Sequence, residues 1–400
     1  MATTLNKELL TAEVQHYLRI NETADAARIA LQKSPFPGIE PAVLAQQLDG
    51  RQRCRLKLPL WYDTPGIYYP PRISVEQASS AQAAAYKSKL VAAGSRVIDL
   101  TGGYGVDSYY LSQRATTLTY CEQQPALAAI AAHNFATLGA QNITVQATDG
   151  LTFLADQPND TFDCIYLDPS RRKGRQKVFL LSDCEPDIAG IQQMLLEKAA
   201  SVYVKVAPLL DISAVLRHLR QISHIHVISV DNECKELLLV LNRTHYGLPQ
   251  LSATALNRHG REQTFRFTQA EEQAAVPTLG LPEAGDYLYE PDAALLKAGA
   301  FKCIGQRYNV AKLHLHTHLY TSARSQPGFI GRAFRVIQLM SYTVFKKSYS
   351  GIQANTSTRN FPLDAAALRK KHRIQDGGDL FLFFCTGPTD ELTVIFASKS

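Results

Sequence analysis

A glycine-rich loop follows an apolar run near residue 100. The run Val97–Leu100 contains Asp99 and leads into Thr101-Gly102-Gly103-Tyr104-Gly105. Glycines let the backbone approach a ligand closely, and a helix that begins after such a loop offers free N–H groups to a polar ligand. Taken alone, this loop predicts a site for a nucleotide-like cofactor.

Further acidic residues stand at or just after the ends of the next apolar segments. Glu122 closes the segment 117–122, Asp149-Gly150 follows the segment 143–147, and Asp168-Pro169 follows the segment 162–167. Each of these dipeptides is common as a turn or a strand exit. Their order, at about one per strand, indicates a single cofactor site rather than unrelated turns.

Strand-like and helix-like segments alternate from residue 96 to residue 221. Such alternation predicts a parallel sheet with helices on both faces, preceded by a helix over 77–92 that Ser74 would cap. The last two strands, 225–230 and 236–241, are separated by only five residues. Because a parallel crossover needs a longer connection, this pair must be an antiparallel hairpin. The expected fold class is α/β, a doubly wound and mostly parallel seven-stranded sheet that ends in an antiparallel hairpin.

Residues 77–245 resemble a class I S-adenosylmethionine-dependent methyltransferase domain, which has a Rossmann-like sheet. Asp99, Gly103 and Gly105 match the first motif of that family, whereas Thr101 stands where the family usually has a glycine. The resemblance implies that S-adenosylmethionine is the cofactor and that its methionine part lies over this loop, Gly102 included.

The same resemblance gives roles to the later acids. Glu122 would bind both ribose hydroxyls, since a carboxylate accepts two hydrogen bonds at once. Asp149, beside Gly150, would accept from the adenine amino group, and Asp168 would lie at the edge of the cofactor. The loop also resembles the dinucleotide fingerprint of NAD enzymes. The position of Asp99 inside the first strand, the Asp168-Pro169 pair and the terminal hairpin favour the methyltransferase.

The residues after Asp168 are unusual for this family. Enzymes that methylate exocyclic amino groups of bases usually have a second proline and then an aromatic ring, where this chain has Ser170 and Arg171. We expect Asp168, with Pro169, to orient or deprotonate the acceptor, and Arg171 and Arg172 to bind the substrate. A guanidinium could bind phosphate or carboxylate bidentately, or stack on a ring. A basic loop without a substrate role is the alternative.

The whole chain is expected to divide into four segments. Residues 1–75 are expected to be a helical region and connector, residues 76–247 the methyltransferase domain, residues 248–285 a linker with one short strand at 264–267, and residues 286–400 a smaller α+β domain. In the last segment we expect strands near the following residues: 334–338, 343–345, 380–385 and 392–396.

Three short motifs extend the resemblance beyond the central domain. Glu76–Ser80, Tyr287–Pro291 and Thr317–Ser322 resemble a family of bacterial methyltransferases with a ferredoxin-like segment and a C-terminal THUMP-like domain. THUMP domains generally deliver RNA to a modifying domain, so the resemblance implies an RNA partner.

Charge is distributed unevenly along the chain. Residues 301–400 hold 14 Lys and Arg against 5 Asp and Glu, whereas residues 1–300 hold 28 against 31. A basic terminal domain on a near-neutral body indicates a polyanionic partner, and a solvated lysine-rich face is the alternative. Aromatic residues among these charges could stack on bases, although most belong to the core. They are Phe334, Tyr342, Phe345 and Tyr349.

Composition is ordinary for a globular protein, with 46% hydrophobic and 20% charged residues. No apolar run approaches the ~20 residues that cross a bilayer. We therefore expect no membrane partner. The seven scattered cysteines contain no Cys-x-x-Cys, so we expect reduced thiols in a cytoplasmic protein. His314-x-His316-x-His318 would line one strand face and could hold zinc. With no carboxylate or cysteine close to it in the sequence, we expect no metal.

These observations together predict an S-adenosylmethionine-dependent methyltransferase that acts on RNA. A small-molecule or protein acceptor remains open, as does an RNA-binding module with an inactive methyltransferase fold.

Overall fold

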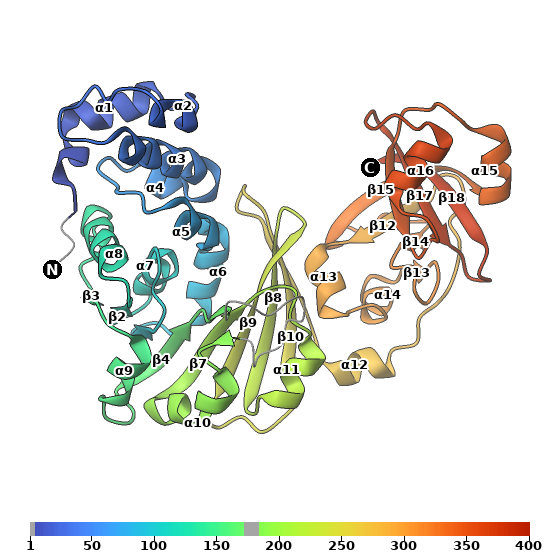
Figure 1. The fold of residues 1–400 in the computed structure, drawn as a ribbon. Helices are drawn as coiled ribbons and strands as arrows, with labels where there is room; N and C mark the ends of the chain where they lie inside the picture. The colour runs from blue at the N-terminus through green and yellow to red at the C-terminus, as the bar shows by residue number, and fades with distance from the viewer. Residues whose placement is uncertain (1–4, 172–183) are drawn as a thin grey trace. The chain divides into compact units, whose positions relative to one another are not determined.

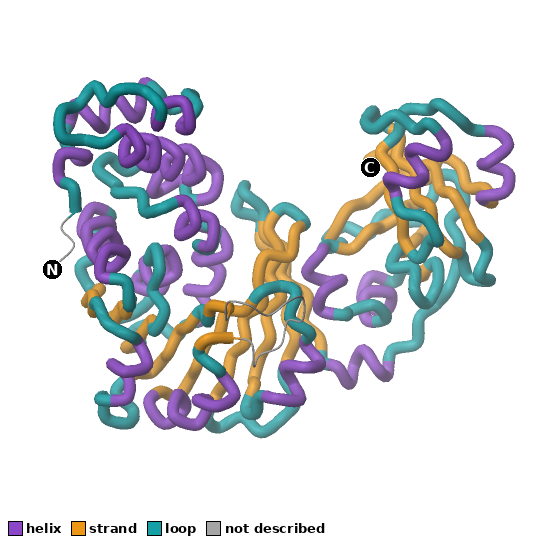
Figure 2. The backbone as a smooth tube through the Cα atoms, viewed as in Figure 1, coloured by secondary structure: helices purple, strands orange, loops and turns teal. Residues whose placement is uncertain are grey.

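The computed structural model describes residues 5–171 and 184–400 (Figures 1 and 2). Two compact units are present. Residues 1–223 and 237–247 belong to the first unit, and residues 224–236 and 248–400 belong to the second. Among the described residues, no helix combines the length and the apolar character needed to cross a bilayer.

A mixed sheet of nine strands has the order β11-β10-β8-β9-β7-β4-β1-β2-β3. The strands β4, β1, β2 and β3 run parallel, as do β4 and β7, whereas β9 runs antiparallel to β7. The bounds are β1 (Arg96–Asp99), β2 (Thr117–Cys121), β3 (Ile143–Gln146), β4 (Phe162–Leu167), β7 (Ala199–Val206), β8 (Ile222–Val230), β9 (Glu233–Asn242), β10 (Gln250–Leu256) and β11 (Glu262–Phe267).

The predicted count of seven strands is wrong, because β10 and β11 add two strands to the sheet. β10 pairs in parallel with β8, and β11 pairs antiparallel with β10. Both new strands lie in the range 248–285, where we expected a linker with only the strand at 264–267. The sequence of β10 hides its burial, since Ser252 and Thr254 are 1% and 0% exposed. Buried hydroxyls break the apolar alternation that marks a strand.

The order of the strands places the candidate site. Strand β1 lies between β2 on one side and β4 on the other, so the direction of chain progression reverses there. Ligands of open α/β sheets bind outside the carboxyl ends of the strands at such a reversal. The loops that follow β1 and β4 both begin at this point, and they contain the glycine-rich loop and Asp168.

Helices separate the parallel strands, and side-chain caps fix where several of them begin. Asp149, Asp187 and Asp211 each accept a backbone N–H in the first turn of the helix that follows. The helices are α6 (Ala81–Leu90), α7 (Val106–Ser112), α8 (Pro125–Thr137), α9 (Gly150–Ala155), α10 (Ile188–Lys198) and α11 (Ile212–His218).

Ser74 does not cap the helix that precedes β1, contrary to our expectation. It lies inside α5 (Arg72–Gln77), which ends because Ala78 has an extended backbone. Ser80 caps α6 instead and accepts from the backbone N–H of Ala83 at 3.3 Å.

The N-terminal helices share a core with the helices of the sheet domain. Trp61 is 1% exposed, and its ring centroid lies 5.1 Å from that of Tyr109 and 6.4 Å from that of Tyr104, which belongs to the glycine-rich loop. The N-terminal region therefore packs against the glycine-rich loop and α7. Its elements are η1 (Lys7–Leu10), α1 (Ala12–Ile20), α2 (Ala26–Ala30), α3 (Pro41–Lys57), α4 (Pro59–Asp63) and α5.

A second sheet of seven strands lies in the C-terminal part, in the order β13-β14-β12-β15-β18-β17-β16. Its strands are β12 (Tyr287–Pro291), β13 (Ala311–Lys312), β14 (Tyr320–Ser322), β15 (Gly331–Ser341), β16 (Asn355–Arg359), β17 (Leu380–Thr386) and β18 (Leu392–Lys399). Its helices are α13 (Ala293–Ala298), α14 (Cys303–Tyr308), α15 (Tyr342–Ser348) and α16 (Ala365–His372), and α12 (Gln269–Ala274) precedes it.

Two expectations for this part are wrong. Residues 343–345 belong to helix α15 and not to a strand, because Ser341 caps the helix by accepting from the backbone N–H of Val344. The three histidines 314, 316 and 318 lie between β13 and β14, outside any strand. The His318 ring stacks on Phe301 at 3.8 Å instead.

Candidate functional site

The loop after β1 is held by the buried carboxylate of Asp99. That residue is 1% exposed and accepts from the backbone N–H of Thr101 at 3.0 Å and from Ser108 Oγ at 2.5 Å. Burial raises the pKa of Asp99 to about 7, although both hydrogen bonds oppose the rise. Asp99 therefore ties the two ends of the loop together.

The glycines of the site serve two purposes. A Cβ at Gly102 would lie 2.0 Å from the ring of Tyr120, and one at Gly150 would lie 2.2 Å from the carbonyl oxygen of Leu100. Gly105 has φ +83° and faces Phe135. Gly103 has φ +57°, and its nearest neighbour would be 3.8 Å away. Three of these glycines thus allow close packing. At Gly103 only the Thr101 carbonyl oxygen lies within 4 Å of where a Cβ would be, so a ligand can approach the backbone there.

Glu122 reaches from the end of β2 to this loop. Its Oε2 accepts from the backbone N–H of Gly103 at 3.0 Å, and its Oε1 accepts from the backbone N–H of Gln124 at 2.8 Å. Asp149 is exposed and caps α9, where its Oδ1 accepts from the backbone N–H and the hydroxyl of Thr152. Glu122 is therefore joined directly to the loop, while the hydrogen bonds of Asp149 hold α9.

Asp168 lies directly beside the loop. Its backbone N–H donates to Thr101 Oγ1 at 2.6 Å, which joins the carboxyl ends of β4 and β1. Pro169 follows, and then β5 (Ser170–Arg171) pairs with β6 (Cys184–Glu185). Threonine at the position usual for glycine thus has a function here, since its hydroxyl holds the Asp168 backbone. Arg172 lies outside the described residues, and the Arg171 side chain is not described.

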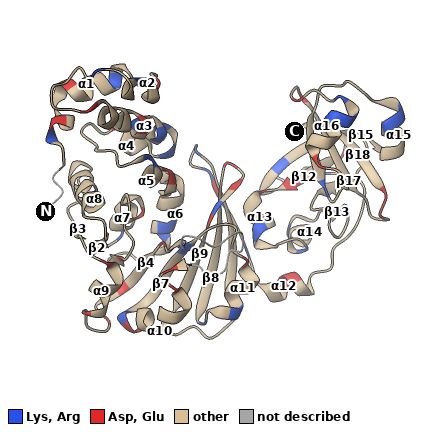
Figure 3. Ribbon diagram, viewed as in Figure 1, with Lys and Arg blue, Asp and Glu red and all other residues tan. Residues whose placement is uncertain are grey.

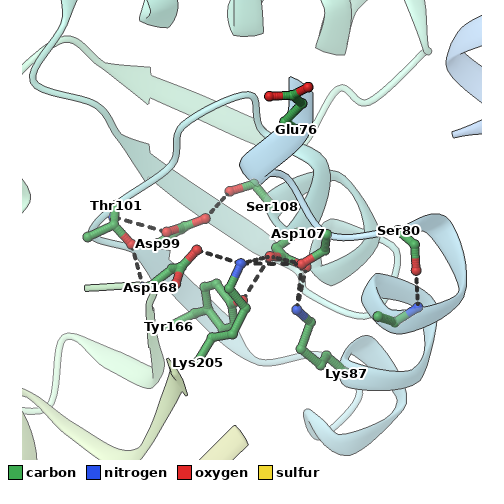
Figure 4. Close-up of polar contacts among 12 residues, drawn as sticks. Glu76, Ser80, Lys87, Asp99, Thr101, Asp107, Ser108, Tyr166, Asp168 and Lys205 are labelled. Atoms are coloured by element: carbon green, nitrogen blue, oxygen red, sulfur yellow. Dashed lines mark hydrogen bonds and ion pairs between the residues drawn. The ribbon is translucent and has the colours of Figure 1, made fainter. Parts of the chain in front are cut away.

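A buried chain of alternating charges adjoins Asp168 (Figure 4). Lys205 Nζ lies 2.5 Å from Asp168 Oδ2 and 3.8 Å from Asp107 Oδ2, and Lys87 Nζ lies 2.9 Å from Asp107 Oδ1. Tyr166 donates its hydroxyl to Asp107 Oδ2 at 2.8 Å. These residues come from α6, α7, β4 and β7, so four separate elements converge on one charged site.

The pKa values of the two carboxylates in the chain of charges, Asp107 and Asp168, are shifted in opposite directions. Burial opposes ionisation of Asp107, but Lys87 and Lys205 outweigh it and lower the pKa of that carboxyl to about 2. Burial raises the pKa of Asp168, and Lys205 opposes the rise. Asp107 is thus a fixed negative charge, while Asp168 is the carboxylate whose proton affinity is higher.

Comparison with known proteins supports the methyltransferase that the sequence motifs predict. A crystal structure of a protein assigned as a methyltransferase from Porphyromonas gingivalis W83 superposes with a TM-score of 0.85. It is 31% identical and covers 99% of both chains.

This chain belongs to the S-adenosylmethionine-dependent methyltransferases.

Two curated relatives of the methyltransferase come from strains of Mycobacterium tuberculosis, CDC 1551 and H37Rv. Both are named uncharacterised S-adenosylmethionine-dependent methyltransferases, and both are 24% identical over 310 residues, which is 76% of this chain and 80% of the relative. Family models match a ferredoxin-like domain at residues 287–329 and a THUMP-like domain at residues 331–399. The enzyme accordingly uses S-adenosylmethionine as its methyl donor.

The residues around the methyltransferase loop fit this cofactor. Gly103 leaves space beside a left-handed backbone turn, and the Glu122 carboxylate, 7% exposed, lies at the same turn. The cofactor carries hydroxyls and an amino group, which match carboxylate acceptors. Within residues 5–171 and 184–400, no group of three or more His, Cys, Asp and Glu residues could hold a metal ion.

Sequence reasoning missed most of the charged chain. Lys205 follows an apolar strand and precedes Pro208, a position that fits a strand-end lysine as well as a substrate contact, and Lys87, Asp107 and Tyr166 have no recognisable spacing. The one available signal was the motif Glu76–Ser80. Its Ser79 donates to Asp107 Oδ2 at 2.8 Å and accepts from Lys87 Nζ at 2.8 Å.

Proposed function

We propose that this methyltransferase modifies RNA, that residues 76–247 carry out methyl transfer and that residues 286–400 capture the RNA. The observation that carries the RNA assignment is a group of exposed lysines on α15 and α16, inside the THUMP-like match (Figure 3). They are Lys346, Lys347, Lys370 and Lys371, and we call them the α15–α16 lysine surface.

Two helices, α15 and α16, build this surface. Tyr342 is buried between them, and its ring centroid lies 5.1 Å from Lys346 Nζ and 5.6 Å from Lys371 Nζ. A buried aromatic ring therefore lies beneath two of the four ammonium groups, those of Lys346 and Lys371. By contrast, Arg332 and Arg359 of the same domain both bind the buried carboxylate of Glu290, which compensates one of their two charges.

Three of the four aromatic residues considered for base stacking are buried in the fold, and the fourth, Tyr349, is half-buried against Phe345 and Phe396. Phe334 and Phe345 are 0% exposed and Tyr342 is 7% exposed. Phosphate contacts by lysines therefore account for the proposed capture, and sequence-specific reading of bases would have to come from elsewhere.

We assign the cofactor roles as the family resemblance suggests. The loop with Thr101, Gly102, Gly103 and Gly105 would lie beneath the methionine part of the cofactor, Glu122 would bind the ribose, and Asp149 and Gly150 would lie at the adenine. The bound group supplies an activated methyl that a nucleophile can attack, with the sulfur as the leaving group. Asp168 and Pro169 would then orient the acceptor, and Arg171 and Arg172 would bind substrate phosphate.

The protein's own residues would position the methyl acceptor and accept its proton. Asp168 is fixed by Thr101 at its backbone and by Lys205 at its carboxylate. A held acceptor near a held methyl group removes much of the entropic barrier to reaction. Because the Asp168 side chain is 37% exposed, an incoming acceptor can reach it.

Label transfer tests the proposal. Tritiated S-adenosylmethionine would be incubated with the enzyme and with total RNA, protein and metabolite fractions from cells that lack the gene. We expect label in RNA, and less of it with a variant in which the α15–α16 lysine surface is changed to serine. Label only in protein or metabolites would replace the RNA proposal with that acceptor. Cofactor binding without transfer to any fraction would indicate an inactive binding module.

A further inference from the structure

The solvent exposure of the chain of charges differs between its two ends, since Lys87 is buried and Asp168 is partly exposed. Side-chain exposure is 1% for Lys87, 11% for Asp107, 10% for Lys205 and 37% for Asp168. Asp168 is thus the member that a substrate can reach, and the three other charges act on the substrate through it.

We propose that the methyl acceptor is a hydroxyl oxygen, the ribose 2′-hydroxyl of an RNA nucleotide, and that Lys205 is the positioning residue that prepares Asp168 to take the hydroxyl proton. This inference rests on the RNA methylation proposed above and adds the acceptor atom.

Lys205 fixes both the direction and the charge of Asp168. At 2.5 Å from Oδ2, the ammonium favours the ionised carboxylate, which can accept a proton. Asp107 lies on the other side of Lys205 and is itself held by Lys87 at 2.9 Å. The alternating order lets the four charges share a site with little water, because each has an opposite charge beside it.

This arrangement suits an oxygen acceptor better than a nitrogen acceptor. A base nitrogen attacks with a lone pair and can lose its proton afterwards, whereas a neutral hydroxyl is a weak nucleophile and must lose its proton as the bond forms. A buried cation beside the proton-accepting group stabilises negative charge that develops on the oxygen. Ser170 and Arg171, in place of proline and an aromatic ring, also remove the stacking surface that amino-group methylation uses.

The proposed step balances as follows. The hydroxyl oxygen forms a bond to the methyl carbon while the carbon–sulfur bond breaks, and the electron pair of that bond remains on sulfur, which becomes neutral. The hydroxyl proton passes to Asp168, and Lys205 keeps its own proton throughout.

Product chemistry tests the acceptor atom. RNA labelled by the full-length enzyme would be hydrolysed in alkali, in which cleavage requires a free 2′-hydroxyl. We expect the label in dinucleotides, since a methylated 2′-oxygen cannot attack the neighbouring phosphate. Label in mononucleotides would overturn the hydroxyl assignment and leave RNA methylation standing. No label in RNA would overturn both proposals.

Two substitutions test the role of Lys205. Lys205→Met should lower kcat by about 10²–10⁴-fold, as for loss of acid–base assistance. The KM for RNA and the calorimetric affinity for S-adenosylmethionine should stay within about twofold of those of the unchanged enzyme, as expected for a residue that acts on the reaction and not on binding. Lys205→Arg should recover at least tenfold of the lost rate, because it restores a cation beside Asp168.

A control separates this role from a structural one. Lys198 is another lysine of the first unit, and it donates to the carbonyl oxygen of Ala155 at 3.3 Å instead of to a member of the chain of charges. Lys198→Met should therefore leave kcat unchanged. Unchanged kcat in Lys205→Met would overturn the assignment. Parallel losses of cofactor affinity and thermal stability in that variant, without rescue by arginine, would overturn it too.

Discussion

The ammonium of Lys87 lies 2.9 Å from the carboxylate of Asp107, and the Lys87 side chain is 1% exposed. A cation this deeply buried is stable only beside its partner, and removing one member leaves an uncompensated charge. The pair links α6 to the first turn of α7, directly after the glycine-rich loop. It therefore connects the stability of the fold to the geometry of the site.

Lys87→Met should lower the free energy of unfolding by about 3 kcal/mol, the low end of the range for a broken buried pair, since Lys205 still faces Asp107. The double variant Lys87→Met/Asp107→Asn should lose less than the sum of the two single variants. Urea unfolding measures all three. Lys89→Met, at an exposed position of the same helix, is the control. Strict additivity would show that the two residues are not coupled.

Asp99 should make stability fall as pH rises. Its pKa is about 7 in the folded chain, against about 3.9 in an unfolded chain. Between these values the folded chain keeps a proton that the unfolded chain releases, so stability decreases with pH across this window. Asp99→Asn cannot ionise at this position, so its free energy of unfolding should not fall in this way. As pH rises from 4.5 to 7.5, the free energy of unfolding of the variant should increase by about 2–4 kcal/mol relative to that of the unchanged protein. Parallel stability–pH curves for the two proteins would contradict this expectation.

Glu122→Ala should weaken S-adenosylmethionine binding by about 2–4 kcal/mol, the range for losing charged hydrogen bonds. Glu122→Gln keeps the shape and one acceptor oxygen, so it should fall between alanine and the unchanged enzyme. Isothermal calorimetry on variants with unchanged circular dichroism measures the affinities. If folded Glu122→Ala binds as tightly as the unchanged enzyme, the ribose role belongs to another residue.

Gly150→Ala should destabilise the protein by about 2 kcal/mol or more, as overpacking against rigid atoms does. The added Cβ would meet the backbone of Leu100 at 2.2 Å, which cannot move without shifting β1. Gly190→Ala is the matched control, because Gly190 lies exposed in α10 with its nearest neighbour at 3.4 Å. It should be neutral or stabilising through helix propensity. Equal thermal midpoints for the two variants would refute the packing argument.

The α15–α16 lysine surface should govern the salt dependence of RNA binding. Each phosphate contact that is lost should reduce the slope of log K against log salt by about 0.7–0.9. We would change the four lysines to serine and compare fluorescence anisotropy across a salt series with a variant at four other lysines. These control positions are Lys7, Lys33, Lys89 and Lys235, all exposed.

Substitution is the better test than truncation here. A chain cut near Ser325 would lose β15, which pairs directly with β12, so the remaining strands would lack their partner. Equal affinities and slopes for the two four-lysine variants would show that the surface has no special part in binding RNA.

The sequence alone determined the chemistry-bearing edge of the sheet. Asp99, Glu122 and Asp168 each stand at or just after the end of an apolar run, and the carboxyl ends of parallel strands meet at one edge. Local pattern and chain order suffice for this inference, because each residue is placed by the strand that precedes it. The resemblance to the methyltransferases rests on motifs at these positions, and comparison with known proteins confirms it.

Only the tertiary structure revealed the chain of charges and the full width of the sheet. Lys205 and Ser79 lie 126 positions apart and yet approach to 3.5 Å, and no periodicity in the sequence relates them. Likewise β10 buries Thr254, whose polar type predicts exposure and whose hydroxyl lies 3.0 Å from that of Thr264 on β11. In both cases the decisive energy comes from neighbours brought by other elements, since a buried charge or hydroxyl is stable only beside partners that the local sequence does not contain.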